Sequence, residues 1–303
     1  MRVGISLTSA HAGVEDRTGA RWMIERAAAA NRAGLDSLFI GDHHSTPTPY
    51  YQNVPMLGRL LAEWGDQPAG CLFLLPLWNP VVVAEQIGTL ASIHSGRFIL
   101  QCALGAGQSQ FAGVGADLRM RPSAFEEGLD AIRRLLDGET VSGTRRYRFK
   151  EATVSPRTTE PLEVWIGGSV EASIDRAARL GDGWLAGPEL DSTRALGWSD
   201  FYRLKVGEYG REPTAVAIRR DIFVGESDSH AASIAGPIVE GGYRGLDPSA
   251  LVFGSPETVA ARFCEYAKMG YTDVIVRHLT DDQEAVLSSM ARLAEVRKAV
   301  ADA

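Results

Sequence analysis

The sequence predicts an α/β fold, a closed (β/α)8 barrel with loop insertions. Eight short apolar runs alternate with longer amphipathic runs, and such repetition requires parallel strands joined by right-handed crossovers. Some runs, such as Arg97–Leu104 (RFILQCAL), are apolar almost throughout, as strands buried on both faces are. Eight units over about 280 residues fit a barrel. The doubly wound alternative needs a GxGxxG turn after the first strand, which Leu7–Gly13 (LTSAHAG) does not supply.

The expected strands are short, apolar runs bounded by polar or turn residues. In chain order they are Val3–Leu7, Ser37–Ile40, Ala69–Leu75, Arg97–Leu104, Leu162–Ile166, Gly183–Ala186, Ala215–Val224 and Asp273–Arg277. The segment Glu139–Phe149 interrupts this rhythm. We expect it to form a hairpin or an excursion, with Gly143 near its turn.

The expected helices are amphipathic, and several carry start or stop signals. They are Gly19–Ala33, Met56–Trp64, Pro80–His94, Pro122–Leu136, Ser169–Leu180, Thr193–Tyr209, Ser229–Glu240, Pro256–Lys268 and Gln283–Val300. Gly34 offers the first helix a left-handed cap. Pro80 stands at a first-turn position, where its missing N–H costs nothing, and Ser255 precedes Pro256 as a cap. No linker rich in Pro, Gly and Ser divides the chain, so we expect one domain over residues 1–303.

Composition excludes several classes of protein. With 45% hydrophobic and 23% charged residues, the chain is too apolar to be disordered. Its 31 basic and 38 acidic residues give a net charge of −7, which argues against a nucleic-acid platform. Cys71, Cys102 and Cys264 lie in apolar stretches without metal-ligand spacing, so we expect buried, reduced thiols. Neither a signal peptide nor an apolar run of about 18 residues is found, so we expect a cytoplasmic protein with no membrane partner.

The segment Gly41-Asp42-His43-His44-Ser45 follows the second expected strand, at the barrel end where sites of this fold are built. Three interpretations are open: a metal site, a structural histidine that caps a loop, and a catalytic or ligand-contacting histidine. A metal cluster would need carboxylates after later strands, and none follows Leu75 or Leu104. We therefore expect no metal, and we favour a histidine that moves a proton near neutral pH.

Glycine-rich turns follow two other expected strands. Gly105-Ala106-Gly107-Gln108 would let the backbone approach a ligand closely. Gly167-Gly168-Ser169 opens a helix, where free N–H groups, a hydroxyl and the helix dipole suit a phosphate. The alternative for the second turn is a simple serine N-cap.

Aromatic residues are expected around the same end of the barrel. Trp78 follows the third strand and could stack on a flat ring or cap the core. Tyr50 and Tyr51 lie in the long loop Ser45–Asn53 and could line a substrate pocket together with His44. Packing is an equal alternative for these tyrosines.

Taken together, the segments resemble the bacterial luciferase-like superfamily of flavin-dependent oxidoreductases. The order and spacing of the matching segments carry the resemblance, and no single motif does. They are Ala33–His44 (AGLDSLFIGDHH), Asn79–Gly107, Phe125–Glu139 (FEEGLDAIRRLLDGE), Pro161–Leu185 and Gly254–Val276. The resemblance implies a luciferase-like TIM barrel that holds FMN or coenzyme F420 at its C-terminal mouth.

The resemblance also implies roles for individual residues. His43 matches the active-site histidine, and Leu72 and Phe73 match a pair joined by a cis peptide bond against the flavin ring. Gly105 to Gln108 match the segment that passes the flavin, and Gly167, Gly168 and Ser169 match the phosphate-binding turn. One departure is Gln108, which stands where an acidic residue is common, so we expect it only to form hydrogen bonds.

Two cofactor chemistries fit the resemblance. Our main interpretation is a two-component monooxygenase that takes reduced FMN from a separate flavin reductase and oxidises a small organic substrate. The alternative is an F420-dependent oxidoreductase that transfers a hydride, with His43 moving the companion proton. The basic residues Arg119, Arg121, Arg145 and Arg146 could pair with a cofactor phosphate, and the acidic tail of F420 would favour a basic groove.

Two further alternatives come from other classes of protein. The chain could be a barrel that binds flavin without catalysis, or a metal-dependent hydrolase built on Asp42, His43 and His44. The resemblance also implies a homodimer, and the apolar face of Met56–Trp64 would suit a two-fold contact.

Overall fold

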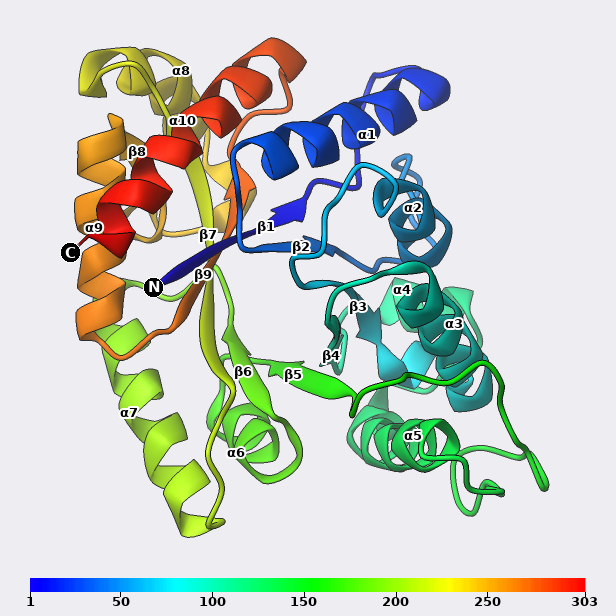
Figure 1. Ribbon diagram of the computed structural model, residues 1–303. Helices are drawn as coiled ribbons and strands as arrows, with labels where there is room; N and C mark the ends of the chain where they lie inside the picture. The colour runs from blue at the N-terminus through cyan, green and yellow to red at the C-terminus, as the bar shows by residue number, and fades with distance from the viewer. Residues whose placement is uncertain (303) are drawn as a thin grey trace.

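A computed structural model describes residues 1–302, and in it eight parallel strands close into a barrel (Figure 1). The strands pair in the order β6-β5-β4-β3-β2-β1-β9-β7, and pairing of β6 with β7 closes the ring. The strands are β1 (Arg2–Leu7), β2 (Ser37–Ile40), β3 (Ala69–Leu74), β4 (Phe98–Ala103), β5 (Glu163–Gly167), β6 (Gly183–Ala186), β7 (Ala215–Val224), β8 (Val252–Gly254) and β9 (Asp273–His278). The predicted closed (β/α)8 barrel is confirmed.

Helices surround the barrel, as Figure 1 shows. They are α1 (Asp16–Arg32), α2 (Asn53–Leu60), α3 (Pro80–Ile93), α4 (Gln108–Gly113), α5 (Arg121–Leu136), α6 (Glu171–Leu180), α7 (Ser192–Glu208), α8 (Asp228–Glu240), α9 (Pro256–Lys268) and α10 (Gln283–Ala301). Within residues 1–302, none of these helices has the length and apolar character needed to cross a bilayer.

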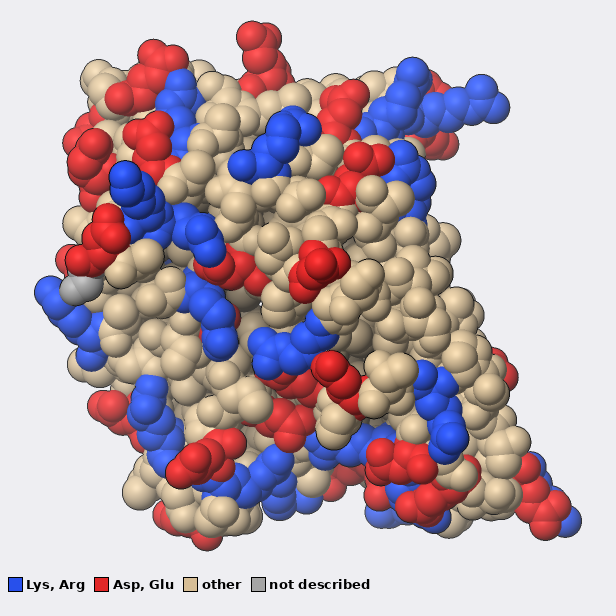
Figure 2. All heavy atoms as spheres, viewed as in Figure 1, with Lys and Arg blue, Asp and Glu red and all other residues tan. Residues whose placement is uncertain are grey.

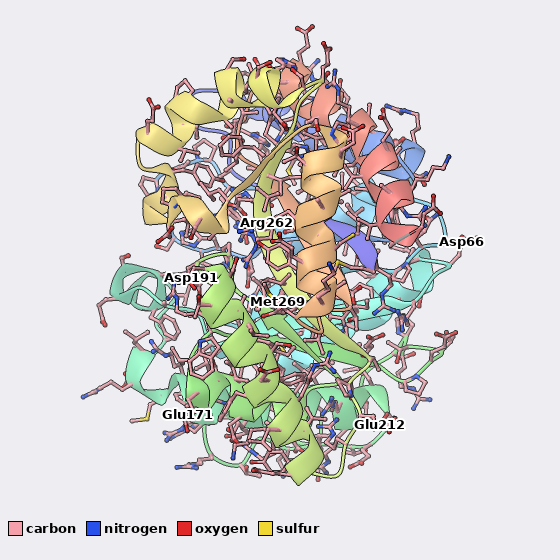
Figure 3. The ribbon with its side chains drawn as sticks, turned by 90° about the vertical axis from the view of Figure 1, so that its left-hand side faces the viewer. Asp66, Glu171, Asp191, Glu212, Arg262 and Met269 are labelled. Atoms are coloured by element: carbon pink, nitrogen blue, oxygen red, sulfur yellow. The ribbon has the colours of Figure 1, made fainter. Side chains whose placement is uncertain are left out.

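The predicted helix signals act as expected. Gly34 adopts a φ of 69° directly after α1. The side chain of Asn79 accepts a hydrogen bond from the N–H of Val81 at the start of α3, and Ser255 does the same for Thr258 at the start of α9. Asp191 caps α7 by accepting from the N–H of Arg194, and Arg262 of α9 donates to Ser192 in that first turn (Figure 3).

Alternation along the strands divides the core into two layers. Phe39, Ile99, Trp165, Ala217 and Ile275 form a cluster inside the barrel. The intervening strand residues join a larger cluster between barrel and helices. Cys71 and Cys102 are buried in that outer layer as expected, but Cys264 on α9 remains partly exposed. Over the face seen in Figure 2, basic and acidic side chains are interspersed, in keeping with the small net charge.

Of the two forms expected for Glu139–Phe149, the structure has the excursion, because this part of the chain makes only one antiparallel bridge, between Val141 and Ala152. Three other features differ from the sequence prediction. Strand β8 and helix α4 were not expected. Helix α2 begins at Asn53 and ends at Leu60, earlier than predicted. Its residues Leu57 and Leu60 are buried against the barrel, and a homodimer contact on this helix stays a prediction.

Candidate active site at the barrel mouth

The parallel strands all end at one rim of the barrel. Asp42 follows β2 at this rim and holds the neighbouring segments in place. The side chain of Asp42 is buried, and its Oδ2 accepts hydrogen bonds from the N–H of Leu74 and from Nε1 of Trp78, both at 2.8 Å. Nε2 of His44 lies 3.0 Å from Oδ1 of Asp42, although the ring is not aligned for a well-directed hydrogen bond. Asp42 therefore positions its neighbours.

His43 is the histidine of this segment whose ring remains available. The side chain is half-buried, and its ring centroid lies 5.5 Å from that of Tyr50. The segment is held through its backbone, because Gln52 donates from Nε2 to the carbonyl of His43 at 3.1 Å. No side chain within residues 1–302 forms a hydrogen bond to the His43 ring, so both ring nitrogens can serve a ligand.

The loop after β2 is tied to the loop after β4 by Gln110, which the sequence analysis missed. Oε1 of Gln110 accepts from the N–H of His44 at 2.8 Å, and its Nε2 donates to the carbonyl of Ala106 at 3.0 Å. His44 also packs edge-on against Trp78, with ring centroids 5.1 Å apart. His44 and Trp78 are thus framework residues of the rim. The one sequence signal for Gln110 was a polar side chain two residues after the glycine turn that ends at Gln108.

The glycine turn after β4 has the predicted backbone freedom. Gly105 and Gly107 have φ values of 71° and 94°, which side chains rarely adopt. At Gly107 no atom would contact an added Cβ within 4 Å, so the backbone there faces open space. Ala106 and Gln108 are exposed. The turn therefore presents bare main chain at the mouth.

The structure corrects the picture for the β3 pair. The Leu72–Phe73 peptide bond is trans, and the one cis bond within residues 1–302 is Ser155–Pro156. Both residues pair regularly with β4, and alternation turns Phe73 outward, where it is fully buried against Trp78 at 5.2 Å. Leu72 remains half-buried on the inner side. A ligand in the mouth can contact Leu72, but it can reach Phe73 only through the backbone.

The turn Gly167-Gly168-Ser169 lies at the end of β5 but Ser169 is not a helix cap. Helix α6 begins at Glu171, labelled in Figure 3, and Oγ of Ser169 accepts from the N–H of Gly187 at 3.1 Å. Trp184 donates from Nε1 to the carbonyl of Gly168 at 2.8 Å. An added Cβ at Gly168 would collide with the side chain of Ser173, which explains the glycine. Glu171 places an acidic group in the first helical turn, which weakens the case for a phosphate there.

The two tyrosines of the loop after β2 lie in different surroundings. Tyr50 is half-buried beside His43 at the mouth, where its hydroxyl lies against Gly41. Tyr51 instead packs on α1, and its hydroxyl donates to the carbonyl of Asp16 at 2.5 Å. The substrate-pocket prediction is therefore wrong for Tyr51, because the extended chain turns successive side chains to opposite sides.

A charged cluster inside the barrel was also missed. Asp221 of β7 is fully buried, and its carboxylate accepts from Arg219 at 2.9 Å, from Arg244 at 2.9 Å and from the hydroxyl of Tyr243 at 2.9 Å. Arg277 stands opposite Asp221 in the β7–β9 ladder. Burial alone would raise the pKa of Asp221, but the surrounding arginines hold that pKa below its ordinary value. The sequence did carry a signal for this cluster, namely charged residues at alternate positions of an otherwise apolar strand.

A basic groove lies beside the rim, next to the ends of β3 and β4. The cavity has a volume of about 470 Å³, and its lining includes Trp78, Asn79, Met120, Arg145, Arg146 and Arg148. Glu127 holds this segment in place by accepting from the N–H groups of Arg145 and Arg146 at 2.9 and 2.6 Å. Arg145 and Arg148 are exposed, so their charge faces the groove and solvent.

The histidine and carboxylate groups do not make a metal centre. Within residues 1–302, no three His, Cys, Asp or Glu side chains are grouped so that they could hold a metal ion. The rim instead carries buried polar groups without partners, among them Nε2 of Gln101 on the inner wall of β4. Such a donor is costly to bury unless a ligand or water accepts from it. The arrangement therefore suits an organic ligand with acceptor atoms.

Comparisons of sequence find relatives that use F420. An F420-dependent glucose-6-phosphate dehydrogenase of Beutenbergia cavernae is 31% identical over 168 residues, covering 52% of this chain and 49% of that protein. One from Intrasporangium calvum is 29% identical over 183 residues, covering 56% and 54%. An F420-dependent hydroxymycolic acid dehydrogenase of Mycobacterium tuberculosis is 26% identical over 229 residues, covering 70% and 61%. The chain thus spans about half to three-fifths of the length of these relatives.

Comparisons of structure find the same fold in enzymes of both cofactor types. A monooxygenase, RslO1, of Streptomyces bottropensis superposes with a TM-score of 0.84 at 20% identity, covering 97% of this chain and 98% of that one. The oxygenating component of 3,6-diketocamphane monooxygenase from Pseudomonas putida, with FMN, gives 0.83 at 20%, covering 99% and 98%. An F420-dependent secondary alcohol dehydrogenase gives 0.78 at 16%, covering 99% of each chain.

The family model described as luciferase-like monooxygenase matches residues 1–247 of the chain. That match spans the barrel from β1 through β7 and includes the rim residues from Asp42 to Ser169, whereas Arg277 on β9 lies beyond it. The chain therefore belongs to the luciferase-like family of flavin- or F420-dependent oxidoreductases.

Proposed function

We propose that this oxidoreductase uses coenzyme F420 and transfers a hydride to or from a small organic substrate. This proposal replaces the FMN interpretation favoured by the sequence alone. Its support is twofold: the relatives at 26–31% identity are F420-dependent dehydrogenases, and the groove beside the rim is basic. The solved monooxygenases are similar at only 20% identity and the solved F420-dependent alcohol dehydrogenase at 16%, so these structures support the fold and not the cofactor.

The basic groove is the observation that carries the proposal. It is lined by Trp78 and Asn79 at the rim and by three arginines, Arg145, Arg146 and Arg148, against one acidic residue, Asp117. F420 ends in an acidic polyglutamyl tail, whereas FMN ends at its phosphate. Exposed arginines attract several carboxylates along a groove, and Arg146 is already held there by a 2.7 Å hydrogen bond from Nε to Oγ of Ser123.

The rim residues fit a flat, acceptor-rich cofactor. Leu72 offers an apolar wall, and Nε2 of Gln101 is a buried donor without a partner. Gly105 and Gly107 would let the ring pass close to the main chain.

When bound, the deazaflavin supplies a carbon that accepts or gives a hydride. This chain's part is to hold the substrate and to move the companion proton. His43 performs that proton transfer, because its ring is accessible and forms no hydrogen bond to residues 1–302. Asp42 and Trp78 fix the backbone from which His43 projects.

Paired titrations with F420 and FMN, followed by fluorescence, test the proposal. We expect F420 to bind more tightly than FMN, and its affinity to fall as salt is raised, because the groove acts through charge. The double variant Arg145→Gln/Arg148→Gln should weaken F420 by about tenfold and leave FMN nearly unchanged. Arg134→Gln is the matched control, since Arg134 is a surface residue paired with Glu139 and does not line the groove. Tighter binding of FMN than of F420 would restore the FMN interpretation.

A further inference from the structure

The charged cluster at the mouth holds more positive than negative charge. Arg219, Arg244 and Arg277 surround one carboxylate, Asp221, so the local sum is 3 − 1 = +2. Only 20% of the Arg219 side chain is exposed, and Asp221 is fully buried. Positive charge in such a site is costly unless an anion balances it.

Asp221 cannot balance all three arginines, because its acceptor sites are already used. Oδ1 accepts from both Nε and Nη2 of Arg219, and Oδ2 accepts from Arg244 and Tyr243. Arg277 donates only from Nε, to Oγ1 of Thr8 at 3.2 Å. Its two terminal nitrogens have no acceptor within residues 1–302. The adjacent Arg220 shows the contrast: it points outward and is satisfied by Tyr266 and Leu190.

The backbone around the cluster is shaped to bring these groups together. Arg219 and Asp221 alternate on the inner face of β7, and Arg277 is the register partner of Asp221 on β9. Arg244 reaches the same carboxylate from a loop in which it has a φ of 50°, between Gly242 and Gly245. A positive φ at a bulky residue is uncommon and tends to mark functional sites.

The cluster lies across the barrel from the proposed cofactor wall. The ring order places β7 and β9 opposite β3 and β4. The groove for the cofactor tail also lies on the β3–β4 side. Between the two sides is Tyr50, whose hydroxyl has a pKa raised by burial and therefore stays a neutral donor. Tyr50 contacts the ring of His43.

We infer that Arg219, Arg244 and Arg277 form a binding site for an oxyanion of the substrate, a phosphate or a carboxylate. This inference rests on the proposed function, and it names the substrate class. A molecule held there by its anionic group would extend past Tyr50 toward His43, where the hydride and proton are exchanged. Guanidinium groups suit this task because they bind phosphate and carboxylate through paired N–H donors.

Inorganic phosphate is the probe, titrated by calorimetry at low ionic strength with and without saturating F420. We expect saturable binding to the wild type in both cases. Arg277→Gln should weaken phosphate by about tenfold or more and leave the F420 affinity unchanged, since Arg277 takes no part in the Asp221 hydrogen bonds. Arg244→Gln should act in the same direction. Arg134→Gln, which removes a surface charge paired with Glu139, is the control.

The outcomes separate this inference from the proposed function. No saturable phosphate binding by the wild type overturns the inference. An equal loss of F420 affinity in Arg277→Gln also overturns it, because the arginines would then hold the cofactor's own phosphate. Phosphate binding through Arg277 in a chain that does not bind F420 supports the anion site and overturns the proposed function. Turnover gives a further test, with pairs of alcohols that differ only by one phosphate group. We expect the phosphorylated alcohol to react, and an equal turnover rate with the neutral alcohol contradicts the inference.

Discussion

His43 and His44 are neighbours in the sequence, but their rings have different surroundings. The His44 ring lies 3.0 Å from Asp42 and packs on Trp78, so its orientation is fixed by the framework. The His43 ring touches Tyr50 and is otherwise open to the mouth. The same dipeptide thus supplies one imidazole fixed by the framework and one accessible imidazole, and it is to the accessible one that our proposal assigns the proton transfer.

His43→Gln should lower kcat by about 10²- to 10⁴-fold, the usual range for losing a general acid or base. Cofactor affinity should change little, because the Gln52 hydrogen bond goes to the backbone of residue 43. Steady-state kinetics with F420 and direct titration measure the two quantities. His230→Gln on the outer helix α8 is the control. Unchanged kcat in His43→Gln would mean that another group moves the companion proton.

Single residues show where prediction from sequence stops. The positions of His43, Gly105 and Gly107 at the barrel mouth could be predicted, because each follows shortly after an apolar run that predicts a strand and because glycine favours such turns. Gln110 was missed, because its role depends on a hydrogen bond to His44, 66 positions away. Phe73 was assigned to the mouth although strand alternation turns it outward. Arg219 and Asp221 carried a visible signal, charges two apart in an apolar run, but their meaning needed the facing Arg277.

Among the elements, α7 contains a glycine that no packing requirement explains. Gly197 is exposed within this helix, and no atom would meet an added Cβ within 4 Å. Gly197→Ala should therefore raise the free energy of unfolding by about 0.5–1 kcal/mol, because alanine loses less backbone entropy in a helix. Denaturant unfolding measures the change.

Gly88→Ala on α3 is the matched comparison and should have the opposite sign. An added Cβ there would collide with the carbonyl of Pro156, so we expect a loss of about 1–3 kcal/mol. If both alanine variants change stability in the same direction, local packing is not what distinguishes these two helical glycines.

The first and last residues of a helix or strand were predictable where capping or polar residues mark its ends. Pro256–Lys268 and Ala215–Val224 match the structure at both ends, since a cap or a polar boundary marks each. Strand β8 was missed because only three residues form it, and they pair with the part of β7 that extends past β6. Helix α2 starts earlier than expected because Pro55 is tolerated in its first turn.

For the whole molecule, two buried histidines set an acid limit on stability. Burial lowers the pKa of His278 to about 3, and burial together with Arg26 lowers that of His11 to about 4. Above pH 6.5, the ordinary value, both are neutral in the folded and unfolded chains. As the pH falls below 6.5, the unfolded chain binds protons and the folded chain does not. The free energy of unfolding should therefore fall by up to about 1.4 kcal/mol per pH unit for each histidine.

Denaturant unfolding between about pH 7.5 and pH 5 measures this dependence. His278→Gln should make the free energy of unfolding less dependent on pH, whatever it does to stability at neutral pH. An identical slope in His278→Gln and the wild type would mean that other groups control acid unfolding.

The two halves of the mouth come from different stretches of chain. The wall assigned to the cofactor is built by residues 69–169, whereas the arginine cluster is built by residues 215–278. Natural or laboratory recombination could therefore exchange the second stretch between relatives without disturbing the first. A chimaera that carries β7 to β9 of a relative without these arginines would inherit that relative's choice of substrate and keep this chain's choice of coenzyme.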